Sequence, residues 1–120
     1  MNSLFLDAKD FNLELTPNSE REGGISRILS DKIEEILELS LDNDFNSARI
    51  KMSELTNIYG LSEKDFLKYM NEAINKNKYK EMKELIEILA KYDYRIITGS
   101  NPDIQLTALL AEISNLRKTE

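Results

Sequence analysis

The side chains that could do chemistry in this chain are carboxylates, lysines, arginines and hydroxyls, because its 120 residues include no Cys and no His. Thiol nucleophiles, disulfides, most zinc sites and imidazole general bases are therefore excluded. Paired carboxylates could act as acid and base, but no nucleophile or oxyanion site accompanies them, and neither GxxxxGK[ST] nor GxGxxG occurs. We predict that the chain is not an enzyme and needs no metal or cofactor.

Charge is uneven along the chain. Residues 31–44 contain six acids and one lysine, whereas residues 76–83 contain four lysines and one glutamate. The acidic segment could be a metal or partner surface and the lysine corner could touch a phosphate backbone, but solvated faces explain both more simply. The net charge of -6 argues against general polyanion binding.

Two polar residues stand within the most apolar stretch, DYRIITGSNPDIQLTALLAEI, at residues 93–113. Burying Arg95 alone would be costly, so its head group should reach solvent or pair with Asp93 or Asp103. Gln105 stands between two apolar residues that cannot both face the same side, so it could simply point outward. For both residues, a structural role and an interface role remain open.

The elements that position these residues are predicted to be helices from residue 25 onward. Apolar residues recur at the spacing that places them on one face of a helix. The expected stripes are Ile33, Ile36, Leu37 and Leu41; Phe45, Ala48, Met52, Leu55 and Tyr59; Phe66, Met70, Ala73 and Ile74; Met82, Leu85, Ile86, Leu89 and Tyr92; and Ile104, Leu106, Leu109, Leu110, Ile113 and Leu116. Five helices joined by short loops predict an all-α five-helix bundle.

Capping residues predict where the helices begin and end. The expected N-caps are Ser30, Asp44, Ser62 and Asn101, with Pro102 in the first position of the last helix. Gly60 should end the second helix, and residues 98–100 should form a turn. The fourth helix is predicted over about residues 79–93 and the fifth over residues 102–117.

Residues 1–24 differ from the rest and are predicted to be a leader or linker before a helical domain of residues 25–120. TPNSEREGG has linker composition, and DFNLEL leaves a short strand, a helical turn or disorder open. No apolar run approaches the roughly 20 residues of a membrane span, and the N-terminus is acidic where a signal peptide is basic. We therefore expect a soluble, cytoplasmic protein.

Two stretches carry a family pattern: LDNDFNSARIKMSELTNIYGLSEKDFLKYM and LAKYDYRIITGSNPDIQLTALLAEI. They resemble the C-terminal collar domain of clamp-loader small subunits, particularly archaeal replication factor C small subunits, over about residues 31–114. The pattern falls on Asp44, Ala48, Arg49, Tyr59 to Ser62, Asp93, Tyr94, Arg95, Ile96, Gly99, Gln105, Leu106, Leu109 and Leu110, with Ile96 replacing the usual Leu.

The resemblance implies a non-catalytic oligomerisation domain that joins clamp-loader subunits into a five-subunit collar for DNA replication. The wider complex would bind ATP, sliding clamp and primer-template DNA. The chain lacks the family's phosphate-binding loop, acidic metal motif and arginine-finger segment, and residues 1–24 do not resemble the ATPase lid that precedes the collar. A cut-out domain and a natural stand-alone piece both remain open.

We expect the last helix, together with Arg95, to lie at a subunit boundary, because its apolar residues cover more arc than one buried stripe requires. The candidate interface residues are Arg95, Gln105, Leu106, Leu109, Leu110 and Ile113. Such a contact is head-to-tail and needs several compatible subunits, identical or different, to close a ring.

Two alternatives belong to other functional classes. Residues 44–75 could form a helix-turn-helix DNA-binding regulator with its turn at residues 59–61, although Glu63 and Asp65 would face DNA phosphates. The chain could also be a helical adaptor for another protein partner.

Overall fold

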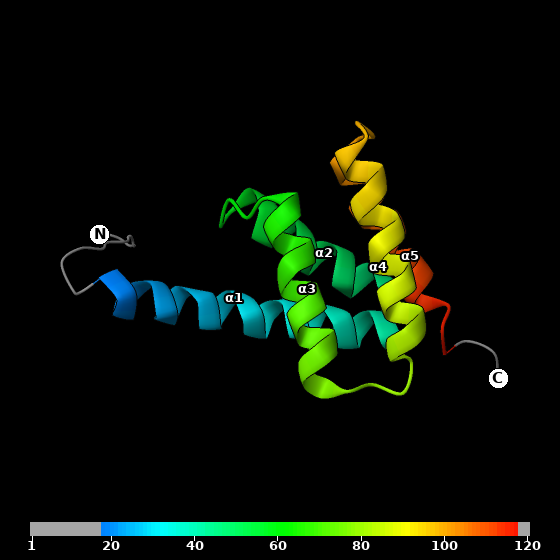
Figure 1. Cartoon of the computed structure of the whole chain (residues 1–120), viewed down its shortest axis with the longest axis horizontal. Coiled ribbons are helices and arrows are strands. Elements are labelled where there is room, and N and C mark those ends of the chain that lie inside the picture. Colours follow the sequence, from blue (N-terminus) through cyan, green and yellow to red (C-terminus); the bar gives the residue numbers. More distant parts are fainter. Residues whose placement is uncertain (1–17, 118–120) are drawn as a thin grey trace.

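The computed structural model describes residues 18–117, and within that range the chain forms five α-helices and no strand (Figure 1). The helices are α1 (Asn18–Leu41), α2 (Phe45–Asn57), α3 (Glu63–Asn77), α4 (Met82–Ile97) and α5 (Pro102–Ser114). The predicted all-α, five-helix class is therefore confirmed for this part of the chain. The strand, helical turn or disorder considered for DFNLEL falls in residues 1–17, outside the described residues.

Helix α1 is the longest element, and three other helices pack on it. Helices α2, α3 and α5 all contact α1, while α4 packs on α3 and α5. In Figure 1 the N-terminal part of α1 extends beyond the other helices on one side, and the end of α4 and the start of α5 together form a projecting tip. The resulting molecule measures 49 × 30 × 23 Å.

The core lies where the inward faces of the five helices meet. Most residues of the predicted stripes are buried there, and Leu61, Leu67 and Ile88 join them although no stripe included them. Tyr59, Ile86 and Ile104 were predicted on the stripes but are exposed by 53%, 38% and 65% respectively. Phe45, Met82 and Leu116 are partly buried at the edge of the core.

Three predicted N-caps are confirmed by hydrogen bonds in which a side-chain oxygen accepts from a backbone N–H of the first turn. Asp44 accepts from Ser47 at 3.4 Å and Ser62 accepts from Asp65 at 3.1 Å. Asn101 accepts from the backbone N–H of Ile104 at 3.0 Å, with Pro102 beginning the helix. These bonds satisfy N–H groups that no residue inside the helix can reach.

The fourth predicted N-cap, Ser30, is wrong because Ser30 lies inside α1. Helix α1 already begins at Asn18, so it continues through Gly23 and Gly24, which were predicted to belong to a linker. Glycine disfavours a helix interior by only about 1 kcal/mol relative to Ala. Extending an existing helix adds one hydrogen bond for each residue fixed, so two weak residues do not stop it.

Left-handed backbone conformations mark the ends of four helices, and Asn43 after α1 has φ +66°. Gly60 has φ +70° after α2, Gly99 has φ +103° in the turn between α4 and α5, and Lys78 caps α3 with φ +53°. The Gly60 stop and the turn at residues 98–100 are thus confirmed. Helix α4 was predicted too early in the chain, since it spans Met82–Ile97, and α5 is shorter than predicted.

Candidate functional site

Arg95 lies on the exposed side of the C-terminal end of α4. Its guanidinium carbon is 5.1 Å from the centre of the Tyr92 ring, close enough for a cation–π contact. No ion pair joins Arg95 to Asp93 or Asp103. The sequence allowed either such a pair or a head group that reaches solvent, and the structure shows the head group reaching solvent. Its charge is therefore available at the surface.

Beneath Arg95, a polar cluster joins α4 to α5. The Tyr92 hydroxyl donates to one Glu112 carboxylate oxygen at 2.8 Å, and Lys91 Nζ donates to the other at 2.6 Å. Burial raises the pKa of Glu112, but the hydrogen bonds from Lys91 and Tyr92 outweigh it and leave that pKa below its usual value. Burial also raises the pKa of Tyr92, as does its carboxylate partner. The cluster holds the two helices at the base of the tip.

Four of the predicted interface residues face the core. Leu106, Leu109, Leu110 and Ile113 are each no more than 1% exposed, so their side chains present no surface to another subunit. The wide apolar arc of α5 has a structural cause, because this helix packs on α1, α2, α3 and α4. These four residues can therefore affect an interface only by holding α5 in place.

Gln105 is half-buried beside them. Its Oε1 atom is shielded from solvent and has no hydrogen-bond partner among the described residues, so the expected outward orientation does not describe it. A shielded amide oxygen without a donor is costly. Whether Gln105 and Arg95 contact another subunit stays a prediction.

Two exposed apolar patches lie in separate parts of the molecule. The tip patch consists of Tyr94, Ile97 and Ile104 at the ends of α4 and α5, and each is more than half exposed. The second patch, which we call the overhang patch, consists of Ile25, Ile28, Ile58 and Tyr59, also each more than half exposed. Lys32 Nζ lies 5.6 Å from the centre of the Tyr59 ring, so α1 meets the turn after α2 at this patch.

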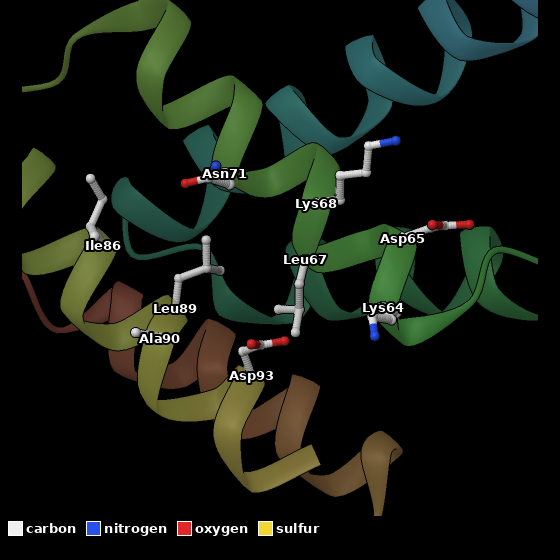
Figure 2. Close-up of a pocket in the computed structure, with 9 residues that line it drawn as sticks. All are labelled: Lys64, Asp65, Leu67, Lys68, Asn71, Ile86, Leu89, Ala90 and Asp93. Atoms are coloured by element: carbon white, nitrogen blue, oxygen red, sulfur yellow. The ribbon is translucent and has the colours of Figure 1, made fainter. Parts of the chain in front are cut away.

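A groove of about 490 Å³ runs between α3 and α4 (Figure 2). Figure 2 shows Leu67 and Leu89 facing each other across it, with Ile86 toward one end and Asp93 toward the other. The remaining lining residues are Lys64, Asp65, Lys68, Asn71 and Ala90. The groove therefore has an apolar floor and a charged rim.

Three acids of α1, Glu34, Glu35 and Glu38, contact side chains of other elements. Glu34 pairs with Lys76 at 3.3 Å and Glu35 pairs with Lys51 at 3.6 Å. Glu38 accepts a hydrogen bond from Tyr79 at 3.2 Å; burial and that carboxylate raise the pKa of Tyr79. Two residues of the predicted lysine corner thus contact α1: Lys76 from the last turn of α3 and Tyr79 from the loop that follows.

Arg117 binds two further acids. Its Nε and Nη2 atoms donate to the two Glu81 carboxylate oxygens at 2.6 and 3.2 Å, and Nη1 lies 3.5 Å from Asp42. The hydrogen bonds from Arg117 hold the pKa of Glu81 below its usual value, against a smaller effect of burial. Among the described residues, no group of three or more acids is arranged to hold a metal ion.

The helices considered for DNA reading are not packed as a helix-turn-helix pair. Helix α2 packs chiefly on α1 and α5, whereas α3 packs chiefly on α1 and α4. The first turn of α3 carries Glu63 and Asp65, which would repel phosphates. None of the described helices combines the length and apolar character needed to span a membrane.

Comparison with known proteins points to one family. A sequence profile of the replication factor C C-terminal domain matches residues 28–112. Among curated relatives, the replication factor C small subunit of Methanocaldococcus jannaschii is 36% identical over 91 residues, which cover 74% of this chain and 5% of the relative. The corresponding subunit of Sulfurisphaera tokodaii is 36% identical over 87 residues, covering 69% of this chain and 27% of the relative.

A third relative, the replication factor C small subunit of Methanococcus maripaludis, is 36% identical over 93 residues. The match covers 76% of this chain and 30% of that protein. The chain thus spans less than a third of the length of these curated relatives.

Proposed function

Because this chain belongs to the family of replication factor C C-terminal domains, we propose that it is the non-catalytic collar domain of a DNA sliding-clamp loader. It acts in DNA replication by assembling with clamp-loader subunits, either further copies of itself or related chains. ATP hydrolysis belongs to partner subunits that carry an ATPase module. Sliding clamp and primer-template DNA are contacted through the wider complex.

The observation that best supports assembly is the presence of two unlike apolar patches on separate parts of the molecule. The tip patch is formed by the ends of α4 and α5, and the overhang patch by the projecting part of α1 and the turn after α2 (Figure 1). Large exposed apolar groups that gather in a patch commonly mark protein interfaces. Two different patches suit a head-to-tail contact, in which the tip patch of one subunit binds the overhang patch of the next. A pair of subunits joined in this way still has one free patch of each kind, so further subunits can add.

Within this proposal, Arg95 and Gln105 lie at the subunit boundary beside the tip patch. Arg95 is exposed and belongs to the same helix end as Tyr94 and Ile97, and Gln105 directly follows Ile104. An arginine at the edge of an apolar contact can bind a carboxylate of the neighbour. The shielded Gln105 oxygen would gain a donor if the neighbour's contact shifted its side chain.

The experiment is a pull-down of the tagged chain from its native source, with the recovered proteins identified by mass spectrometry. Wild type should recover an ATPase-bearing subunit, and Ile97→Asp should reduce that recovery at least tenfold, because a carboxylate in a desolvated apolar contact is costly. Ile86→Asp is the matched control, since Ile86 is 38% exposed on α4 and belongs to neither patch.

Failure to recover any ATPase-bearing subunit with the wild-type chain would contradict the collar function. Equal losses from Ile97→Asp and Ile86→Asp would remove the tip patch from the interface. A salt-dependent shift of duplex DNA by this chain alone would instead favour the DNA-binding alternative.

A further inference from the structure

We propose that the tip patch of one copy of this chain docks on the α1–α2 face of a second copy, so that identical chains associate head-to-tail. The α1–α2 face consists of the overhang patch and a shallow hollow along α2. The inference rests on the head-to-tail contact of the proposed function, and it names the partner in that contact as a further copy of the same chain.

The hollow along α2 extends the overhang patch. It measures about 280 Å³ and is lined by Arg49, Ile50, Ser53, Glu54, Asn57 and Ile58. Ile58 belongs to both the hollow and the overhang patch, so the two form one continuous surface. Ile50 and Ile58 are each more than half exposed. The hollow therefore offers two isoleucine side chains that the described part of the chain leaves in water.

Exposed apolar side chains gather almost entirely on two surfaces. Among the described residues, nine large apolar side chains are exposed. Five belong to the α1–α2 face, three belong to the tip patch, and Ile86 lies apart: Ile25, Ile28, Ile50, Ile58 and Tyr59 on the face, and Tyr94, Ile97 and Ile104 at the tip. Docking of the tip on the face of the next copy would bring the eight grouped side chains together and remove them from water, which favours association.

The shapes of the two surfaces favour an unlike pair. The tip projects beyond the other helices (Figure 1), whereas the α1–α2 face contains the hollow. Two tips in contact would leave both faces in water, and two faces in contact would leave both tips in water. Only a head-to-tail contact that continues from copy to copy covers both surfaces.

Charges on the two surfaces set the orientation of the contact and add little to its strength. The α1–α2 face carries Arg27, Asp31, Lys32, Arg49 and Glu54, and the tip carries Asp93, Arg95 and Asp103. Because each surface has acids and bases, one orientation brings opposite charges together and the reversed orientation brings like charges together. Exposed pairs of this kind contribute little affinity, but they discriminate between orientations.

We expect the association to be weak and to depend on concentration. An interface of standard size has about 20–30 residues on each side. The apolar centre proposed for this contact has three side chains on one side and five on the other. Copies should therefore associate at micromolar or higher concentrations.

Sedimentation equilibrium of the full chain, without other subunits, measures this association. The weight-average mass of wild type should rise above 13.9 kDa as the protein concentration is raised. Ile97→Asp at the tip and Ile58→Asp on the α1–α2 face should each weaken the association at least tenfold, because a carboxylate is costly in a desolvated contact. Ile86→Asp, the matched control, should leave it unchanged. A wild-type chain that keeps the mass of one copy at every concentration overturns the proposal.

A mixture of the two variants tests the head-to-tail arrangement. Ile97→Asp keeps an intact α1–α2 face and Ile58→Asp keeps an intact tip, so the mixture should form pairs with nearly wild-type affinity and nothing larger. Regained association also shows that both variants are folded. Association of Ile97→Asp alone would indicate contact between two faces, and association of Ile58→Asp alone would indicate contact between two tips. Either result, or a mixture that does not associate, would contradict the proposal.

These outcomes are separate from those of the collar assay, because sedimentation needs no partner subunit. A monomeric wild type that still recovers an ATPase-bearing subunit would refute the choice of partner and leave the collar function intact. Self-association without recovery of such a subunit would contradict the collar function and leave the contact between copies standing.

Discussion

Arg117 joins three parts of the chain through side-chain contacts. It binds Glu81, at the start of α4, through two hydrogen bonds, and it approaches Asp42 at the end of α1. Glu81 is only 7% exposed, so its carboxylate depends on this partner much more than a surface acid would. A nearly buried carboxylate that loses its partner keeps the cost of desolvation without the compensating charge.

We predict that Arg117→Ala lowers the free energy of unfolding by about 1–2 kcal/mol at pH 7, measured by urea denaturation. Lys51→Ala should lower it by less than about 0.5 kcal/mol, because Lys51 and Glu35 form an exposed pair at 3.6 Å. If both variants lost the same free energy of unfolding, the burial of Glu81 would not make the Arg117–Glu81 pair more stabilising than the Lys51–Glu35 pair.

The same residues predict how stability depends on pH. The pKa values of Glu81 and Glu112 are both below their usual values in the folded chain, so the unfolded chain binds more protons as acid is added. Their contribution is complete above the unfolded pKa of about 4.3 and is lost as pH falls through the folded values. The difference between wild type and Arg117→Ala should therefore shrink below about pH 4 in urea titrations. A difference that stayed constant down to pH 3 would contradict this account.

At the scale of the elements, the most accurate predictions from the sequence were the N-cap residues, which act on their own helix. Asp44, Ser62 and Asn101 each bond to a backbone N–H three residues later, so their effect requires no knowledge of the rest of the fold. The start of α1 and the bounds of α4 were predicted wrongly, because propensity and spacing do not include what a helix packs against. Here α1 supports α2, α3 and α5 together.

The sequence was less informative about surfaces. Leu106 and Leu109 were predicted to lie at an interface because the apolar residues of α5 cover a wide arc. Such an arc is found on a helix at an interface and also on a helix surrounded by other helices of the same chain. Only the tertiary structure distinguishes these two cases. Tyr94, Ile97 and the α3–α4 groove were not selected. Their exposure depends on where α4 extends beyond its neighbours, and periodicity alone contains no such information.

Two helix ends give opposite predictions. Gly60→Ala should lower the free energy of unfolding by about 1–2 kcal/mol, because an alanine at φ +70° is strained although nothing crowds its Cβ. Lys78→Gly should raise it by up to about 1 kcal/mol, because Lys78 already occupies a left-handed conformation with φ +53° that glycine adopts without strain. Thermal or urea unfolding of both variants checks the signs; a stabilising Gly60→Ala would be inconsistent with a left-handed turn.

At the scale of the whole molecule, the buried core determines stability, whereas we expect the exposed patches to determine assembly. Leu109 is fully buried, whereas Tyr94 is 69% exposed and contributes little to the core. A substitution at either position could reduce the recovery of partner subunits, but for different reasons. The stability of each variant therefore has to accompany every assembly measurement.

We predict that Leu109→Ala lowers the free energy of unfolding by about 2–5 kcal/mol, because Leu109 is fully buried and the substitution leaves a cavity in the core. Tyr94→Asp should change it by less than about 0.5 kcal/mol in the isolated chain. Circular dichroism during urea unfolding measures both. If Tyr94→Asp proved as destabilising as Leu109→Ala, the tip patch would be part of the core and not a free surface.

The projecting end of α1 makes the described part of the chain more than twice as long as it is thick, 49 Å against 23 Å. An elongated particle tumbles and diffuses more slowly than a sphere of the same 13.9 kDa mass. On a gel-filtration column calibrated with globular standards, a single copy will therefore elute early and can be mistaken for a dimer. Light scattering at the elution peak separates a long monomer from a true pair.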